Sequence, residues 1–120
     1  MLNFKDLRIW QDSVSLSVAI YELTNSFPHD EKYGLSAQIK RAAVSVSSNI
    51  AEGKGRGTFP DLRHFLRIAR GSVYEVESQI EVAIALGFVE RRGTEPTIEL
   101  SQRIAKGISR LISSGEQRGD

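Results

Sequence analysis

Hydrophobic residues recur every three or four positions along almost the whole chain, the spacing of an α-helix that buries one side. No useful stretch alternates hydrophobic and polar residues as a half-buried strand would. We therefore expect helices at about 5–26, 35–52, 59–86 and 97–113. Short connections make successive helices antiparallel, so the predicted fold is all-α, an antiparallel up-down-up-down four-helix bundle. The bundle domain spans residues 1–114, and residues 115–120 are expected to form a frayed C-terminal tail.

The first predicted helix has two hydrophobic sides. One stripe contains Leu7, Trp10, Val14, Val18 and Tyr21, and the nearly opposite stripe contains Ile9, Leu16, Ile20, Leu23 and Phe27. A helix on the outside of a monomer needs only one such stripe, and a small bundle has no central helix. We therefore expect self-association, with Ile9, Leu16, Ile20 and Leu23 facing another subunit. The alternative is that loops cover part of one stripe.

Glycines and capping residues predict where the helices end. Gly53 is placed to end the second helix as a left-handed cap, and Gly87 to end the third. Thr58 is a good N-cap for the third helix, with Asp61 completing a pattern similar to a capping box. Gly71 lies in the middle of a helix, at a cost of about 1 kcal/mol relative to alanine. We interpret it as a point of close approach between helices.

A polar stripe on the second helix predicts a network that fixes helix register or a subunit contact. Its proposed members, with two residues from the third helix, are Gln38, Arg41, Ser45, Asn49, Glu52, Ser72 and Glu75. Polar groups trapped between helices must satisfy one another. Glu52 lies in the last helical turn, where an anion is disfavoured, so Arg41, Lys54 or Arg56 should compensate it. The alternative is a solvated polar surface.

The net charge of +1 hides an uneven distribution. Residues 40–70 hold seven Lys/Arg and two Asp/Glu, whereas residues 71–99 hold two Lys/Arg and six Asp/Glu. Arginine binds phosphate with two hydrogen bonds, and glycines beside the basic residues let a loop adapt to phosphates. We therefore predict contact with RNA or DNA, to which His64 could add, through Lys40, Lys54, Arg56, Arg63, Arg67 and Arg70. The alternatives are a solvated basic surface or pairing with the acidic stretch of a neighbour.

Several classes of function lack the residues they need. The chain has no Cys, which excludes a metal site with thiolate ligands. It has two His, which are too few for most metal sites built from histidine. Neither Glu-x-x-His pairs nor a G-x-x-x-x-G-K-[ST] loop occurs. We predict no catalytic residue, cofactor or metal. No uncharged apolar stretch approaches the ~20 residues of a membrane span, and the N-terminus lacks a signal-peptide pattern, so we expect a cytoplasmic protein without a membrane partner.

Two segments carry a family resemblance: RAAVSVSSNIAEGKGR (41–56) and FLRIARGSVYEVESQIEVAIALG (65–87). They resemble the bacterial four helix bundle protein family, whose founding members are the 23S rRNA intervening-sequence proteins. The resemblance implies a ring-like homopentamer. More distant relatives are accessory proteins of diversity-generating retroelements, in which a basic pentamer binds nucleic acid and a reverse transcriptase. The matching positions are Arg41, Ala42, Ser45, Asn49, Glu52, Gly53, Arg56, Ala69, Gly71, Ser72 and Glu75.

This sequence departs from the family pattern in two respects. Ser47 stands where many relatives have proline, which predicts a less interrupted second helix, and the charge is much nearer neutral than in the retroelement accessories. The leading hypothesis is a non-enzymatic homo-oligomer that contacts RNA or DNA. The alternative is a protein-interaction scaffold with an unidentified protein partner and no nucleic acid. A third possibility is a small-molecule site in the central cavity of the ring.

Overall fold

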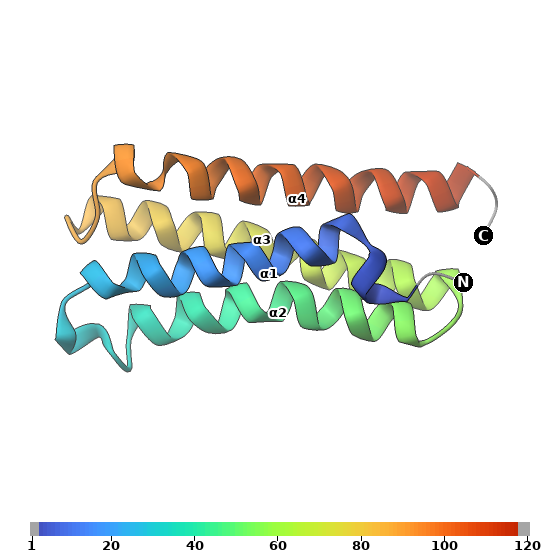
Figure 1. Cartoon of the computed structure of the whole chain (residues 1–120), viewed down its shortest axis with the longest axis horizontal. Helices are drawn as coiled ribbons and strands as arrows, with labels where there is room; N and C mark the ends of the chain where they lie inside the picture. Colours follow the sequence, from blue (N-terminus) through green and yellow to red (C-terminus); the bar gives the residue numbers. More distant parts are fainter. Residues whose placement is uncertain (1–2, 118–120) are drawn as a thin grey trace.

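The computed structural model describes residues 3–117, which fold into four long helices without a β-strand. They are α1 (Arg8–Leu23), α2 (Leu35–Gly55), α3 (Phe59–Ala85) and α4 (Arg91–Gln117). Successive helices run in opposite directions in a bundle of 47 × 23 × 19 Å (Figure 1). α1 packs on α2 and α4, and α3 packs on the same two helices, so α1 and α3 are diagonal. The predicted all-α four-helix fold is confirmed.

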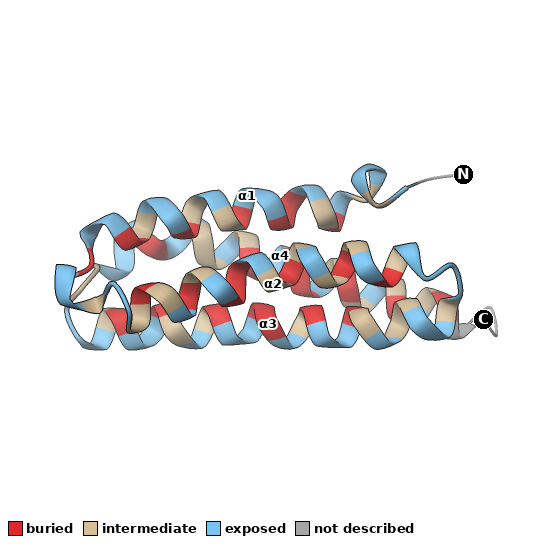
Figure 2. Cartoon of the chain, turned by 90° about the horizontal axis from the view of Figure 1, so that it is seen from below, coloured by how far each residue is buried: buried red, intermediate tan, exposed pale blue. Residues whose placement is uncertain are grey.

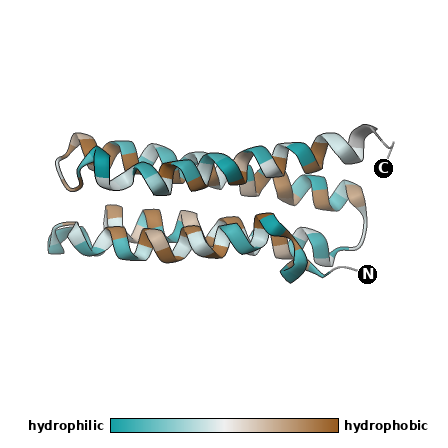
Figure 3. Cartoon of the chain, turned by 45° about the horizontal axis from the view of Figure 1, so that its top comes forward, coloured by the Kyte–Doolittle hydropathy of each residue, from teal (hydrophilic) through white to brown (hydrophobic). Residues whose placement is uncertain are grey.

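Each helix places its hydrophobic stripe on the inward side and leaves hydrophilic positions outside (Figures 2 and 3). The largest fully buried side chains come from all four helices: Leu16, Ile20, Ile39, Val46, Ile50, Leu66, Val73, Val76, Ile80, Thr94, Ile104 and Ile108. Most are β-branched or leucine, which lose little rotamer freedom when packed. Burying each stabilises the fold by roughly 1.5–3 kcal/mol relative to exposure.

The two stripes of α1 have the opposite roles to those expected. Ile9, Leu16 and Ile20 lie in the core of the single chain, with exposures of 9%, 0% and 0%, and half-buried Leu23 packs against them. The prediction that these four residues face another subunit is wrong, because α1 needs this stripe to cover α2 and α4. The exposed hydrophobic side chains of α1 belong to the other stripe: Val14, Val18 and Tyr21.

Several helix boundaries differ from the predicted ones. α1 begins at Arg8 because Leu7 has an extended backbone, and the chain before it forms a separate 3₁₀ turn, η1 (Phe4–Asp6). Two further turns, η2 (Thr24–Ser26) and η3 (His29–Glu31), lie between α1 and α2. α4 begins six residues before the predicted start and takes Pro96 inside the helix. Contacts hold this first turn: Thr94 is buried and donates to the Arg91 carbonyl over 2.7 Å.

The predicted frayed tail is wrong for residues 115–117, because α4 continues to Gln117. Gly115 is buried against Phe59 at the start of α3, and a Cβ at this position would overlap the Phe59 ring. This contact attaches the last turn of α4 to the bundle. The remaining tail residues, 118–120, lie outside the described part of the chain.

Gly53 and Gly71 do not have the roles that the sequence suggested. Gly53 does not end α2; it lies inside the helix and is buried, and a Cβ there would approach the Cβ of Phe65 to 2.7 Å. Gly53 is thus the point of close approach between α2 and α3, while Gly57 has the left-handed backbone, with φ of 88°. Gly71 is exposed, and a Cβ there would meet open space, so its predicted role in packing within the chain is wrong. Gly87, with φ of 79°, follows α3 as predicted.

Candidate nucleic-acid interface

The first half of α3 carries three arginines on the side that faces α4. Thr58 caps the helix by accepting from the Asp61 amide over 3.3 Å, as predicted. The spacing i, i+4, i+7 then places Arg63, Arg67 and Arg70 on one side of the helix. Arg70 donates to Ser109 of α4 over 3.0 Å, which fixes the direction of this row.

α4 carries a second basic row, which lies toward α1, since Arg103 bonds to Asp12 of α1 over 3.3 Å. Arg103, Lys106 and Arg110 follow the spacing i, i+3, i+7 and are all exposed on the outward side of α4. Lys106 and Arg110 flank Ser109, the residue that Arg70 contacts. These side chains form what we call the basic face: Arg63, Arg67, Arg70, Arg103, Lys106 and Arg110. Sequence reasoning missed its α4 half, although the spacing of the three cations signalled it.

Three other predicted cations lie outside this face. Arg56, just beyond α2, bonds to Glu52 over 2.9 Å and lies over the Phe65 ring, so it supplies the compensating charge that Glu52 was expected to need. Half-buried Lys54 is in the last turn of α2, at the same end of the bundle. Lys40 lies apart from the other predicted cations, with its Nζ 4.8 Å from the centre of the Tyr21 ring, in a groove between α1 and α2.

The expected polar network is smaller than predicted. Ser45 and Ser72 join α2 to α3 through a hydroxyl–hydroxyl bond of 2.9 Å. Asn49 donates its side-chain amide to the Ser45 carbonyl over 2.8 Å and to the Ser45 hydroxyl over 3.0 Å. Only these three of the seven proposed residues form the seam. The other four, Gln38, Arg41, Glu52 and Glu75, are exposed on the surface of α2 and α3.

The second half of the seam between α3 and α4 is acidic, and its carboxylates are bonded within the chain. Glu77 accepts from the buried Ser101 hydroxyl over 3.0 Å. Glu81 receives two hydrogen bonds from Arg91, of 2.6 and 3.0 Å. The hydrogen bond and the charge of Arg91 lower the pKa of Glu81, because both favour the carboxylate. These acids therefore tie α4 to α3 and do not pair with the basic face.

The described residues contain no group of three or more His, Cys, Asp or Glu side chains that could hold a metal ion. Over the same residues, no helix combines the length and the hydrophobicity needed to cross a membrane.

Comparisons with known proteins agree with the resemblance seen in the sequence. No curated protein matches the chain. A solved structure with a TM-score of 0.79 and 25% identity covers 87% of this chain and 97% of its own. It is a protein with unknown function from the S23 ribosomal protein family of Bacteroides thetaiotaomicron. The model of the 23S rRNA-intervening sequence protein family matches residues 5–110, and the chain belongs to this family.

Proposed function

We propose that the protein is a non-enzymatic, self-associating bundle that binds RNA or DNA through the basic face. The observation that carries this proposal is the presence of a basic row on each of two packed helices, α3 and α4, which the bond between Arg70 and Ser109 joins. Cations held in rows on rigid helices match the regular spacing of phosphates and release counterions when they bind. Lys106 and Arg110 have no hydrogen-bond or ion-pair partner among residues 3–115, so binding would not break a contact there.

Self-association is supported by two separate hydrophobic patches. On α1 and α2, the exposed side chains line or border a groove: Val14, Val18, Tyr21 and Val44. On α3, the exposed hydrophobic side chains are Ile68, Tyr74, Val82 and Leu86, and Gly71 leaves open space among them. Different patches on one subunit favour a head-to-tail contact, which forms a ring when the rotation between subunits closes on itself. A ring would present several copies of the basic face and raise the affinity for one strand.

The test of nucleic-acid binding is a fluorescence-anisotropy titration with labelled RNA and DNA at two salt concentrations. We compare R67A/R70A with K32A/R92A, which removes two exposed cations outside the basic face. R67A/R70A should weaken binding about tenfold and make it less sensitive to salt. Each lost phosphate contact lowers by about 0.9 the slope of the logarithm of affinity against the logarithm of salt concentration. Equal affinities for the two variants would refute the basic face as the site.

The alternative function is a scaffold that binds only protein, and the exposed hydrophobic patches favour it specifically. Light scattering coupled to size-exclusion chromatography measures the assembly. Val18→Glu should dissociate it, because a carboxylate would be buried without a partner, whereas Gln102→Glu on the exposed side of α4 should not. An assembly without any salt-sensitive nucleic-acid binding would favour the scaffold.

A further inference from the structure

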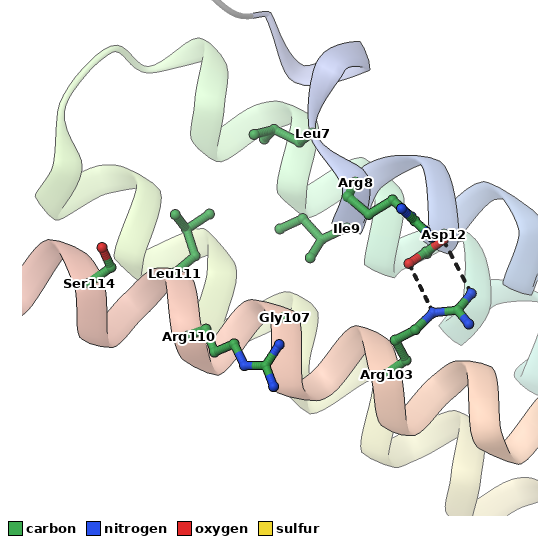
Figure 4. A pocket seen from close by; sticks show the side chains of 9 residues that line it. All are labelled: Leu7, Arg8, Ile9, Asp12, Arg103, Gly107, Arg110, Leu111 and Ser114. Carbon is green, nitrogen blue, oxygen red and sulfur yellow. Dashed lines mark hydrogen bonds and ion pairs between the residues drawn. The ribbon is translucent and has the colours of Figure 1, made fainter.

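A groove between α1 and α4 combines a hydrophobic floor with arginines along one edge. It encloses about 600 Å³. The groove exists because α1 begins at Arg8, whereas α4 continues beyond that level to Gln117, so α1 does not cover the end of α4. Figure 4 shows Leu7, Ile9 and Leu111 around the open space, with Arg110 and Arg103 along the α4 edge. Its volume is in the range of pockets that hold small ligands, about 300–1,000 Å³.

The floor of the groove is set by a close contact. Gly107 of α4 lies under Ile9, and a Cβ at this position would come within 2.7 Å of the Ile9 side chain. The two helices can therefore approach closely here, and they separate toward Leu7 and Leu111, where both side chains are only half-buried. The hydrophobic part of the groove is thus left open by the packing of the single chain.

The arginines of the groove are unequally satisfied. Asp12, which is 9% exposed, is bonded by Arg8 over 3.4 Å and by Arg103 over 3.3 Å (Figure 4). One carboxylate therefore serves two guanidinium groups. Arg110 also lines the groove but has no hydrogen-bond or ion-pair partner among residues 3–115. Arg8, Arg103 and Arg110 outnumber the single carboxylate of Asp12, so this edge of the groove carries a net positive charge. Of the three arginines, Arg110 is the one that does not bond to Asp12.

We infer that this groove binds a small amphiphilic carboxylate of the medium-chain fatty-acid class. The carboxylate is held by Arg110, with Arg103 and Arg8 adding to the positive field, and the alkyl chain lies against Leu7, Ile9 and Leu111. Arginine pairs with a carboxylate through two parallel hydrogen bonds. The groove shares Arg103 and Arg110 with the basic face, but its hydrophobic floor of Leu7, Ile9 and Leu111 favours an alkyl chain over a phosphate. The site goes beyond the proposed function and does not depend on it.

The test is isothermal titration calorimetry of the full chain with octanoate and decanoate, in the absence of nucleic acid. Decanoate should bind more tightly than octanoate by about threefold to fourfold for each added methylene, because the chain is buried. Acetate, which lacks the chain, and 1-octanol, which lacks the charge, should each bind at least about tenfold more weakly than octanoate.

Two matched variants separate the groove from the general charge of α4. Arg110→Gln should weaken octanoate about tenfold, because it removes the unengaged guanidinium, and should fold normally, because Arg110 has no partner among residues 3–115. Lys106→Gln removes a neighbouring exposed cation that does not line the groove, and it should leave binding unchanged. Leu7→Ala should reduce the gain in affinity from octanoate to decanoate.

The inference would be overturned by no binding of decanoate at millimolar concentration, by equal binding of octanoate and 1-octanol, or by equal effects of the Arg110 and Lys106 variants. Equal binding of acetate and octanoate would likewise overturn it in favour of a simple anion site. Failure of the RNA and DNA titrations leaves these results untouched, because no nucleic acid is present.

Discussion

The two ends of the bundle have the same helical architecture and opposite charge. The end made of residues 3–17, 45–72 and 106–117 holds nine Lys/Arg and five Asp/Glu. The end made of residues 18–44 and 73–105 holds six Lys/Arg and nine Asp/Glu. One side of α3 passes from Arg63, Arg67 and Arg70 at the first end to Glu77 and Glu81 at the second. A net charge of +1 therefore describes neither end.

The contacts made at the two ends differ as well. Glu77 and Glu81 bond to Ser101 and Arg91 of α4, so these acids serve the fold. Lys106 and Arg110 make no such bond among residues 3–115. Exposed ion pairs contribute little to stability, about 0–1 kcal/mol, so the charges of either end are not needed for folding. The comparison teaches that both ends use charged side chains to join helices, but that Lys106 and Arg110 of the basic end are available to an anionic partner.

Charge reversal on α4 should produce the largest change. K106E/R110E replaces two exposed cations of the basic face by anions, and we expect RNA and DNA affinity at low salt to fall roughly 100-fold. K32E/R92E makes the same charge change at the acidic end, and it should lower RNA and DNA affinity far less. Anisotropy titrations of both variants in one buffer measure the difference. If both reversals weaken binding equally, the asymmetry between the ends has no functional meaning.

Adding a methyl group tests whether the basic end is also the more tightly packed one. Gly53→Ala brings a Cβ to 2.7 Å from the Cβ of Phe65, which should destabilise the bundle by about 1–3 kcal/mol. Gly93→Ala, in the first turns of α4 at the acidic end, meets open space and should stabilise it by about 0.5–1 kcal/mol. Urea unfolding followed by circular dichroism gives both values. A neutral Gly53→Ala would show that α2 and α3 can separate at no cost.

Neutralising the acidic end should strengthen binding modestly. In E77Q/E81Q, two negative charges are lost. The amide oxygen introduced at position 77 can still accept from Ser101, whereas position 81 keeps one of its two acceptors for Arg91. We expect RNA affinity to rise about twofold to threefold at low salt, since repulsion between this end and the phosphates decreases. The gain should vanish at high salt, and a gain that persists there would point to a change in structure.

The smallest expected effect concerns the pair of Glu81 and Arg91. Because Arg91 lowers the pKa of Glu81, the pair stabilises the fold above the ordinary pKa of glutamate. This contribution is lost as the pH falls through the lowered value. Glu81→Gln should therefore flatten the decrease in melting temperature between neutral and acidic pH. Unchanged pH dependence would show that the pair is not formed in solution.

The sequence predicted much of the fold because helical periodicity is a local signal. The stripe from Leu66 to Ala83 is buried as its spacing indicated, and Thr58 and Gly87 lie where the helix ends were expected. Predictions that depended on tertiary contacts were less successful, although the predicted pair of Ser45 and Ser72 does form. The start of α4 was placed too late because Pro96 is a local signal against a helix, whereas Thr94 and Arg91 are held by contacts.

In the candidate site, too, the sequence revealed what lies on one helix but not which helices come together. The row on α3 could be identified from spacing, but its neighbour on α4 is distant along the chain and belongs to the same surface only through packing, as Arg70 and Ser109 show. Lys40 was assigned to the basic set because it is close in sequence, yet it faces Tyr21 between α1 and α2.

The sequence by itself determined the all-α bundle, the buried stripes of α2, α3 and α4, and the uneven distribution of charge. Only the tertiary structure decided which stripe of α1 is the core, which glycine lies at a close contact, and which cations share a surface. The physical reason is that periodicity specifies the angle of a side chain around its own helix. The identity of the neighbour at that angle depends on how four helices pack together, and no local pattern encodes it.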